Sequence, residues 1–117
     1  MKGQIGVIGA GTMGAGIAQV AAQAGHKVVL SDTNPEQLLK AEKQINASLE
    51  KLVEKAKISA EAAQQIKANL SYSKHLSDHQ AAILVIEAIV ENLTIKHELF
   101  KQLEQVVSNQ CVLASNT

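Results

Sequence analysis

Apolar residues recur along this chain with two different periods, and segments of the two kinds alternate. Short apolar runs predict strands over residues 4–8, 27–31, 70–73, 81–87 and 112–115, and the strand over 81–87 is predicted to be buried. Between these runs, apolar residues spaced three or four apart predict helices over residues 13–24, 35–57, 60–68 and 93–107. Such regular alternation predicts an open, doubly wound parallel α/β sheet with a long helical excursion after the second strand.

Residues typical of helix ends support these limits. Gly25 follows the first helix, where a glycine commonly ends one. Asn34, Pro35 and Glu36 match an N-cap, a first-turn proline and a first-turn acid, and Ser59 can cap the next helix. The predicted apolar stripe of the long helix consists of Leu38, Ile45, Leu49, Leu52 and Ala56.

Composition narrows the class of protein. The 117 residues predict one domain, residues 1–117, and the 11 lysines, without any arginine, balance 11 acidic residues, so we expect no nucleic-acid partner. The glycines, Gln19 and Gln23 interrupt the apolar N-terminal stretch, so we expect neither a signal sequence nor a membrane span, and a cytoplasmic location. Cys111 is followed by the apolar residues Val112 and Leu113 and is predicted to be a buried, unreactive thiol.

A glycine motif, Gly9-x-Gly11-x-x-Gly14, stands between the first predicted strand and the first predicted helix. In that context Gly9 permits a tight turn, Gly11 lets the backbone approach a pyrophosphate, and Gly14 lets the helix lie close to the sheet. The unpaired N–H groups at the start of the helix then bind the anion. The motif therefore predicts a dinucleotide site rather than a turn that serves only packing.

Asp32 ends the second predicted strand, where dinucleotide-binding folds carry the carboxylate that binds the adenosine ribose hydroxyls. A carboxylate there would repel a 2′-phosphate, and the next three residues, Thr33, Asn34 and Pro35, offer no cation to hold one. The sequence therefore predicts NAD rather than NADP as the cofactor.

Two other groups of polar residues have both a functional and a structural interpretation. Ser48, Lys51 and Lys55 fall along one face of the long helix, where they could meet an anionic partner or form a solvated face. Glu91 and Lys96 follow the strand over residues 81–87, at an edge where open α/β sheets bind ligands. Structurally, Lys96 could instead be a solvated helix lysine.

For the other polar residues near that edge, and for the histidines before it, a structural role is the favoured interpretation. Glu87 could be a strand-end carboxylate bonded to backbone, and His97 and Glu98 fit surface positions. His75 and His79 lie near Asp78 without a third ligand at metal spacing, so no metal site is predicted.

Three strings carry a family resemblance, namely GVIGAGTMGAGIAQVAAQAGHKVVLSD, VIEAIVENLTIKHELFKQL and the terminal LASNT. Together they resemble the NAD-binding domain of L-3-hydroxyacyl-CoA dehydrogenases over the entire chain. This resemblance implies a Rossmann-type fold, and reversible oxidation of an (S)-3-hydroxyacyl-CoA to the 3-oxoacyl-CoA, as in fatty-acid β-oxidation. It implies coenzyme A contacts at Ser48 and Lys55. The implied NAD contacts are Gly9, Ala10, Gly11, Thr12, Met13, Gly14, Asp32, Ile89, Val90, Glu91, Lys96 and Asn116.

The catalytic histidine of that family, its glutamate partner and a C-terminal helical domain have no counterpart in these residues. We therefore expect an N-terminal fragment with no catalytic residue, inactive alone, from an enzyme that dimerises through the later domain. Two alternatives remain open: a stand-alone NAD-binding regulatory module, and another Rossmann dehydrogenase that acts on hydroxy acids.

Overall fold

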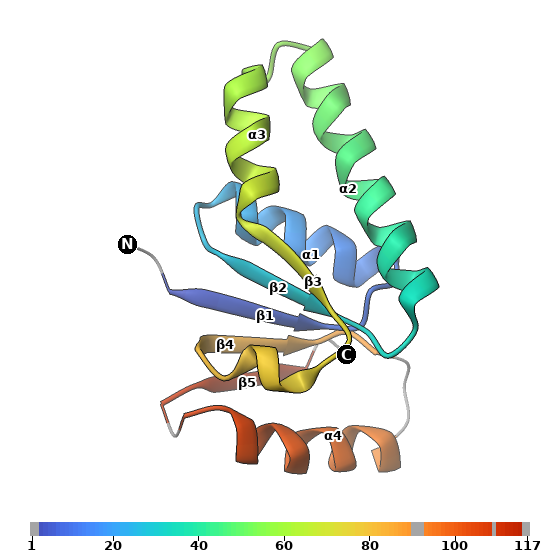
Figure 1. Cartoon of the computed structure of the whole chain (residues 1–117), viewed down its shortest axis with the longest axis vertical. Helices are drawn as coiled ribbons and strands as arrows, with labels where there is room; N and C mark the ends of the chain where they lie inside the picture. Colours follow the sequence, from blue (N-terminus) through green and yellow to red (C-terminus); the bar gives the residue numbers. More distant parts are fainter. Residues whose placement is uncertain (1–2, 90–92, 109, 116–117) are drawn as a thin grey trace.

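The computed structural model describes residues 3–89, 93–108 and 110–115, and the predicted strands and helices alternate in it as expected (Figure 1). A short 3₁₀ helix, η1 (Leu76–His79), is the one described helix that the pattern did not predict. The other elements are β1 (Gln4–Ile8), α1 (Thr12–Gln23), β2 (Val28–Ser31), α2 (Pro35–Glu54), α3 (Ala60–Ala68), β3 (Leu70–Ser73), β4 (Ala82–Glu87), α4 (Leu93–Val106) and β5 (Val112–Ser115).

The five strands form one parallel sheet in the order β3-β2-β1-β4-β5. Successive strands move outward from β1 to β3, and the chain then returns to the other side of β1 to form β4. At the carboxyl end of β1, Ile8 is in register with Ser31 of β2 and with Glu87 of β4. The loops after β1 and β4 therefore leave the sheet side by side, at the type of switch point where open α/β sheets bind ligands.

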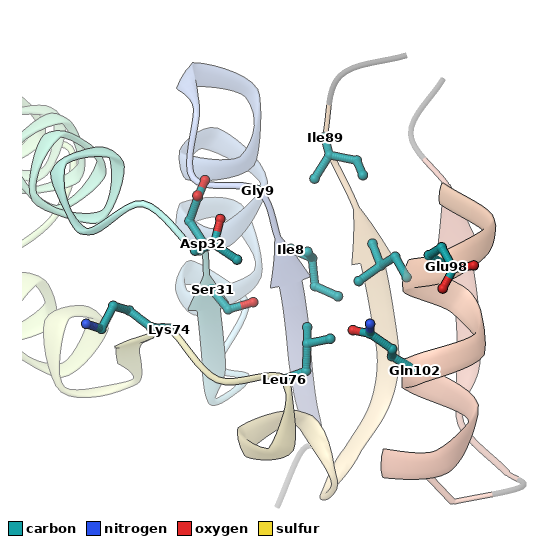
Figure 2. A pocket seen from close by; sticks show the side chains of 11 residues that line it. Ile8, Gly9, Ser31, Asp32, Lys74, Leu76, Ile89, Glu98 and Gln102 are labelled. Carbon is teal, nitrogen blue, oxygen red and sulfur yellow. The ribbon is translucent and has the colours of Figure 1, made fainter. Parts of the chain in front are cut away.

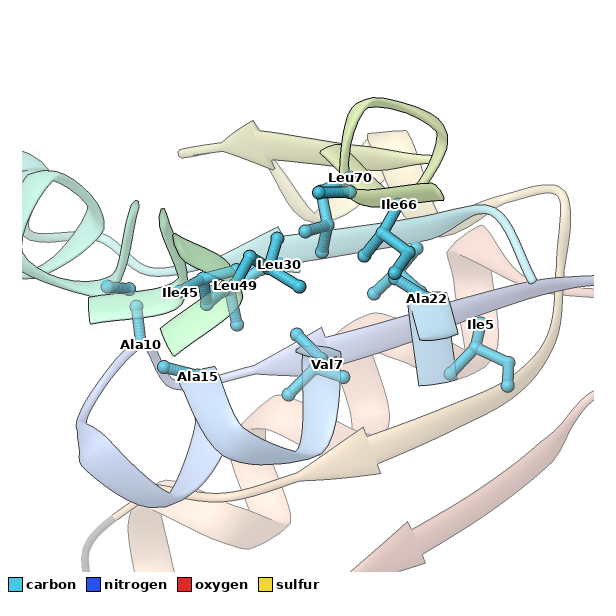
Figure 3. Close-up of a cluster of buried hydrophobic side chains, with 14 residues drawn as sticks. Ile5, Val7, Ala10, Ala15, Ala22, Leu30, Ile45, Leu49, Ile66 and Leu70 are labelled. Carbon is cyan, nitrogen blue, oxygen red and sulfur yellow. The ribbon is translucent and has the colours of Figure 1, made fainter. Parts of the chain in front are cut away.

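Helices cover both faces of the sheet. Helices α1, α2 and α3 lie on one face, and α4 lies on the other (Figure 1). Figure 3 shows the first core, in which Val7 and Leu30 of the sheet meet Ala15 of α1 and Ile45 and Leu49 of α2. Under α4 a smaller core forms around Leu103 and Val85. The small residues of α1 let that helix pack closely on the strands, as its alanine-rich sequence predicts.

The caps at the start of α2 and α3 are confirmed. The side chain of Asn34 accepts a hydrogen bond from the N–H of Glu36 at 2.9 Å, with Pro35 in the first turn. Ser59 accepts from the N–H of Ala62 at 3.0 Å. Gly25 has a φ of 98°, the left-handed conformation in which glycine ends a helix.

The prediction that the long helix extends to residue 57 was wrong. Helix α2 ends at Glu54, because Ala56 adopts a left-handed φ of 56°. The N–H of Lys57 then bonds the carbonyl of Leu52 at 2.8 Å, and the N–H of Ala56 bonds that of Val53 at 3.0 Å. These two bonds form a Schellman motif, which satisfies the last carbonyls of the helix. Ala56 is exposed and does not belong to the apolar stripe.

Two predictions of burial were also wrong. Cys111 is only partly buried, because it lies in the turn just before the edge strand β5. Burial still raises the pKa of its thiol, which disfavours the reactive thiolate near neutral pH. In β4, which was predicted to be a buried strand, Ile83 is half exposed at the end distant from the ligand edge.

Candidate functional site

The glycine loop between β1 and α1 has three glycines with different surroundings. Gly9 has a φ of +106°, and a Cβ there would lie 2.7 Å from the carbonyl oxygen of Ala88. A Cβ on Gly14 would lie 1.7 Å from the carbonyl oxygen of Gly9, so only glycine allows α1 to approach the loop this closely. Around Gly11 no described atom lies within 4 Å of that position. The loop thus leaves open space beside Gly11, where a ligand could contact the backbone.

The N-terminus of α1 points into the same region. Gly11 is its N-cap and cannot offer a side-chain cap, and the first turn contains no acidic residue. No acidic side chain of the first turn therefore neutralises the positive end of the helix dipole, which favours an anion such as a pyrophosphate.

Asp32 lies directly after β2 and is fixed against this loop. Its Oδ2 accepts a hydrogen bond from the N–H of Ala10 at 2.9 Å, and its Oδ1 accepts from the N–H of Asn34 at 2.9 Å. A carboxylate has about four lone-pair sites, so each oxygen can accept a further bond. Because the side chain is only half buried, hydroxyl groups of a ligand can reach it.

A cavity of about 380 Å³ opens beside Asp32 on the α4 face of the sheet. Three residues of the predicted site, Gly9, Asp32 and Ile89, line it. In Figure 2 the side chains of Ile8, Leu76 and Gln102 converge between β1, η1 and α4. The walls supplied by η1 and α4 were not predicted from the sequence, because no local motif marks them. The other lining residues are Ser31, Thr33, Lys74, Glu98 and Leu99.

A buried histidine supports the floor of this cavity. His79 of η1 is fully buried, and its Nε2 lies 2.8 Å from the Oγ of Ser31, the last residue of β2. Its Nδ1 has no hydrogen-bond partner among the residues that the structure describes, and a Cβ on Gly6 would lie only 2.4 Å from that atom. Burial lowers the pKa of His79, and the nearby charge of Asp78 opposes this shift in part. The geometry and the pKa favour a neutral imidazole with its proton on Nε2.

At the ends of β4 and β5, three side chains form a polar cluster, in which Glu87 and Lys96 are buried and Ser115 is exposed. Lys96 Nζ of α4 lies 3.3 Å from Glu87 Oε1, and the hydroxyl of Ser115 donates to the same oxygen at 2.7 Å. Glu87 Oε2 accepts from the N–H of Ile89 at 2.6 Å, which confirms the predicted bond between Glu87 and the backbone. Lys96 is buried, so the interpretation of it as a solvated lysine was wrong.

The other predicted site residues are distributed as follows. Val90, Glu91 and Asn116 lie outside the described residues. Ser48 of α2 accepts a hydrogen bond from Gln19 Nε2 of α1 at 2.9 Å. Lys55 is exposed and forms the C-cap of α2, where its N–H still donates to the carbonyl of Lys51 at 3.0 Å.

The described residues contain neither a candidate metal site nor a candidate membrane-spanning helix. No group of three or more His, Cys, Asp or Glu side chains in that part of the chain could hold a metal ion. None of the described helices is both long enough and apolar enough to cross a membrane.

A parallel sheet with this strand order, an open glycine loop at a helix N-terminus and a carboxylate fixed beside it define a dinucleotide-binding α/β domain. The family model described as 3-hydroxyacyl-CoA dehydrogenase, NAD binding domain, matches residues 4–117. The chain belongs to this family, so its cofactor is NAD.

Individual relatives agree with that assignment. A probable 3-hydroxybutyryl-CoA dehydrogenase of Deinococcus radiodurans is 48% identical over 114 residues, which cover 97% of this chain and 41% of that protein. The human mitochondrial hydroxyacyl-coenzyme A dehydrogenase is 44% identical over 117 residues, covering 95% of this chain and 37% of the relative. The crystal structure of 3-hydroxybutyryl-CoA dehydrogenase from Escherichia coli K12 superposes with a TM-score of 0.95 at 42% identity, over 100% of this chain and 25% of that one. The chain thus spans less than half of each of these relatives.

Proposed function

We propose that this chain holds NAD for a 3-hydroxyacyl-CoA dehydrogenase, which oxidises (S)-3-hydroxyacyl-CoA to 3-oxoacyl-CoA by hydride transfer to the nicotinamide. The observation that carries the proposal is the geometry at the end of β1 and β2. Asp32 is bonded to the N–H of Ala10 inside the glycine loop, and open space lies beside Gly11. A carboxylate and a helix N-terminus held together in this way match the ribose and pyrophosphate of one dinucleotide.

In this proposal the NAD contacts divide among three parts of the chain. The loop over residues 9–14, which includes Ala10, Thr12 and Met13, receives the pyrophosphate. Asp32 accepts hydrogen bonds from the hydroxyls of the adenosine ribose, and the cavity beside it takes the adenine. The nicotinamide half lies at the ends of β4 and β5, with contacts from Ile89, Val90, Glu91, Lys96 and Asn116. Bound NAD supplies the hydride acceptor, and the protein residues position it.

Ser48 and Lys55 are proposed to contact the coenzyme A part of the substrate. Neither Lys51 nor Lys55 forms an ion pair with a carboxylate in the described part of the chain, so both ammonium groups can attract phosphates. The hydroxyl of Ser48 accepts from Gln19 but keeps its own proton to donate. The family resemblance further suggests a homodimer, formed by a later part of the full-length enzyme.

The open space beside Gly11 gives the sharpest test of cofactor binding. Gly11→Ala places a methyl group where no protein atom interferes, so the fold should keep its stability while NADH affinity falls at least about tenfold. Gly16→Ala is the matched control, because a Cβ there also meets open space, but further along α1. That variant should bind NADH as the wild type does and be up to about 1 kcal/mol more stable.

NADH affinity can be measured by fluorescence titration and stability by urea denaturation. Equal NADH affinity in the Gly11→Ala variant and the wild type would contradict the proposed pyrophosphate site. By the family resemblance, none of the four histidines of this sequence falls at the position of the catalytic histidine. We therefore expect the 117-residue chain to bind NADH without oxidising it when acetoacetyl-CoA is added.

A further inference from the structure

The carboxylate of Glu87 joins three segments that are far apart in the sequence. It ends β4, pairs with Lys96 of α4, accepts from Ser115 of β5, and holds the N–H of Ile89 in the loop after β4. Its side chain is completely buried, and that of Lys96 is 8% exposed. The position of the Lys96 ammonium is thus set by a group that a ligand cannot reach directly.

Stability alone is a poor explanation for this cluster. Removing two charges from water costs several kcal/mol per ion, and well-packed apolar residues often stabilise a core as well as a buried ion pair does. The pair lies at the ligand-binding edge of the sheet, in the register position next to Ile8 and the glycine loop. In addition, the Glu87 carboxylate holds the N–H of Ile89, to which the proposed function also assigns a contact with the nicotinamide half.

We propose that Glu87 is a positioning residue for the nicotinamide half of the cofactor. Its carboxylate holds the Lys96 ammonium and the Ile89 backbone in the geometry that this half of NAD requires, without touching the cofactor. Ser115 assists by donating to the same carboxylate oxygen. This inference rests on the proposed function, which assigns Lys96 to the nicotinamide half.

Comparing the binding of two ligands, NADH and ADP, distinguishes a positioning role of Glu87 from a general structural role. NADH occupies both halves of the site, whereas ADP lacks the nicotinamide and its ribose. In the Glu87→Gln variant the side chain keeps its shape but loses the charge that holds Lys96. We expect the Kd for NADH to rise about tenfold, because a charge-assisted contact is lost, and the Kd for ADP to stay within about twofold of the wild-type value. Glu104→Gln, on the exposed part of the same helix α4, is the matched control and should change neither Kd.

A double variant tests whether Glu87 acts through Lys96. Lys96→Met combined with Glu87→Gln removes both charges and leaves neither unpaired. It should bind NADH as weakly as Lys96→Met alone, because the group that Glu87 positions is already absent. If Glu87→Gln does not fold, as judged by circular dichroism, Ser115→Ala removes one donor to the same oxygen. We expect Ser115→Ala to raise the Kd for NADH about threefold and to leave the Kd for ADP unchanged.

The outcomes distinguish this inference from the function on which it rests. If Glu87→Gln raises the Kd for NADH and the Kd for ADP equally, the role of Glu87 is purely structural. If it leaves the Kd for NADH unchanged, Glu87 has no role in binding. Either result overturns the inference and leaves the proposed NAD site intact. A wild-type chain that binds neither NADH nor ADP would overturn the proposed function and the inference together.

Discussion

At the scale of single residues, Ala56 holds a conformation that its side chain disfavours. Its φ of 56° ends α2 in a Schellman motif, a position that glycine usually occupies. A left-handed conformation costs an L-residue about 1–2 kcal/mol, and the greater flexibility of glycine in the unfolded chain offsets part of this difference.

Ala56→Gly should therefore raise the free energy of unfolding by about 0.5–1 kcal/mol, as measured by urea denaturation. Ala47→Gly is the control, since Ala47 is exposed in the interior of the same helix. It should lower the free energy of unfolding by about 1 kcal/mol. Loss of stability in both variants would show that the left-handed conformation of Ala56 is not strained.

At the scale of elements, η1 and β2 are joined by the buried bond between His79 and Ser31. The pKa of His79 is lowered in the folded chain, mainly by burial, whereas an unfolded histidine takes up a proton near pH 6.5. Below about pH 6.5 the unfolded state therefore binds more protons than the folded state, and acid favours unfolding. The contribution of His79 is fully present above about pH 6.5 and is lost progressively as the pH falls.

We expect the free energy of unfolding to fall between pH 7.5 and pH 5.5, and to fall by less in His79→Gln. Glutamine cannot take up a proton but can still bond to Ser31, so the comparison isolates the titration of the imidazole. Urea denaturation of both proteins at the two pH values measures it. The same loss of stability in both proteins would assign the pH dependence to other groups.

The helices and strands could be predicted largely because the residues that mark them lie close together in the sequence. An apolar run or a helix cap depends only on residues a few positions apart. The structure confirms the predicted caps at Asn34 and Ser59 and the helix end at Gly25. The 3₁₀ helix η1 was not predicted, since four residues are too short to show a period. Glu87, Lys96 and Ser115 meet only because β4, α4 and β5 pack together, and the first and the last are 28 positions apart in the sequence. No spacing rule could have identified such a cluster.

At the scale of the whole molecule, strand order assembles the candidate site from the ends of neighbouring strands. The glycine loop follows β1, Asp32 follows β2, Glu87 ends β4, and Ser115 ends β5. Because all five strands are parallel, these groups share one edge of the sheet (Figure 1). A cofactor that spans this edge adds contacts between segments that follow different strands, so its binding should stabilise the entire domain.

NADH at one hundred times its Kd should raise the free energy of unfolding by about 2.7 kcal/mol. The same concentration of NADPH should raise it much less, because the added 2′-phosphate would lie beside the Asp32 carboxylate. Lys74 lines the same cavity, but in Figure 2 its ammonium points away from the side chains that converge there. It is therefore not positioned to neutralise that phosphate.

Asp32→Asn tests whether this charge sets the preference for NAD. Asparagine keeps one oxygen to accept the N–H of Ala10 but removes the repulsion, so the difference between NADH and NADPH in thermal unfolding should narrow. NADH should also stabilise the variant less than the wild type, since the carboxylate no longer accepts from the ribose hydroxyls. Equal stabilisation of the wild type by the two cofactors would show that Asp32 does not determine cofactor choice, and that Lys74 or another cation compensates for its charge.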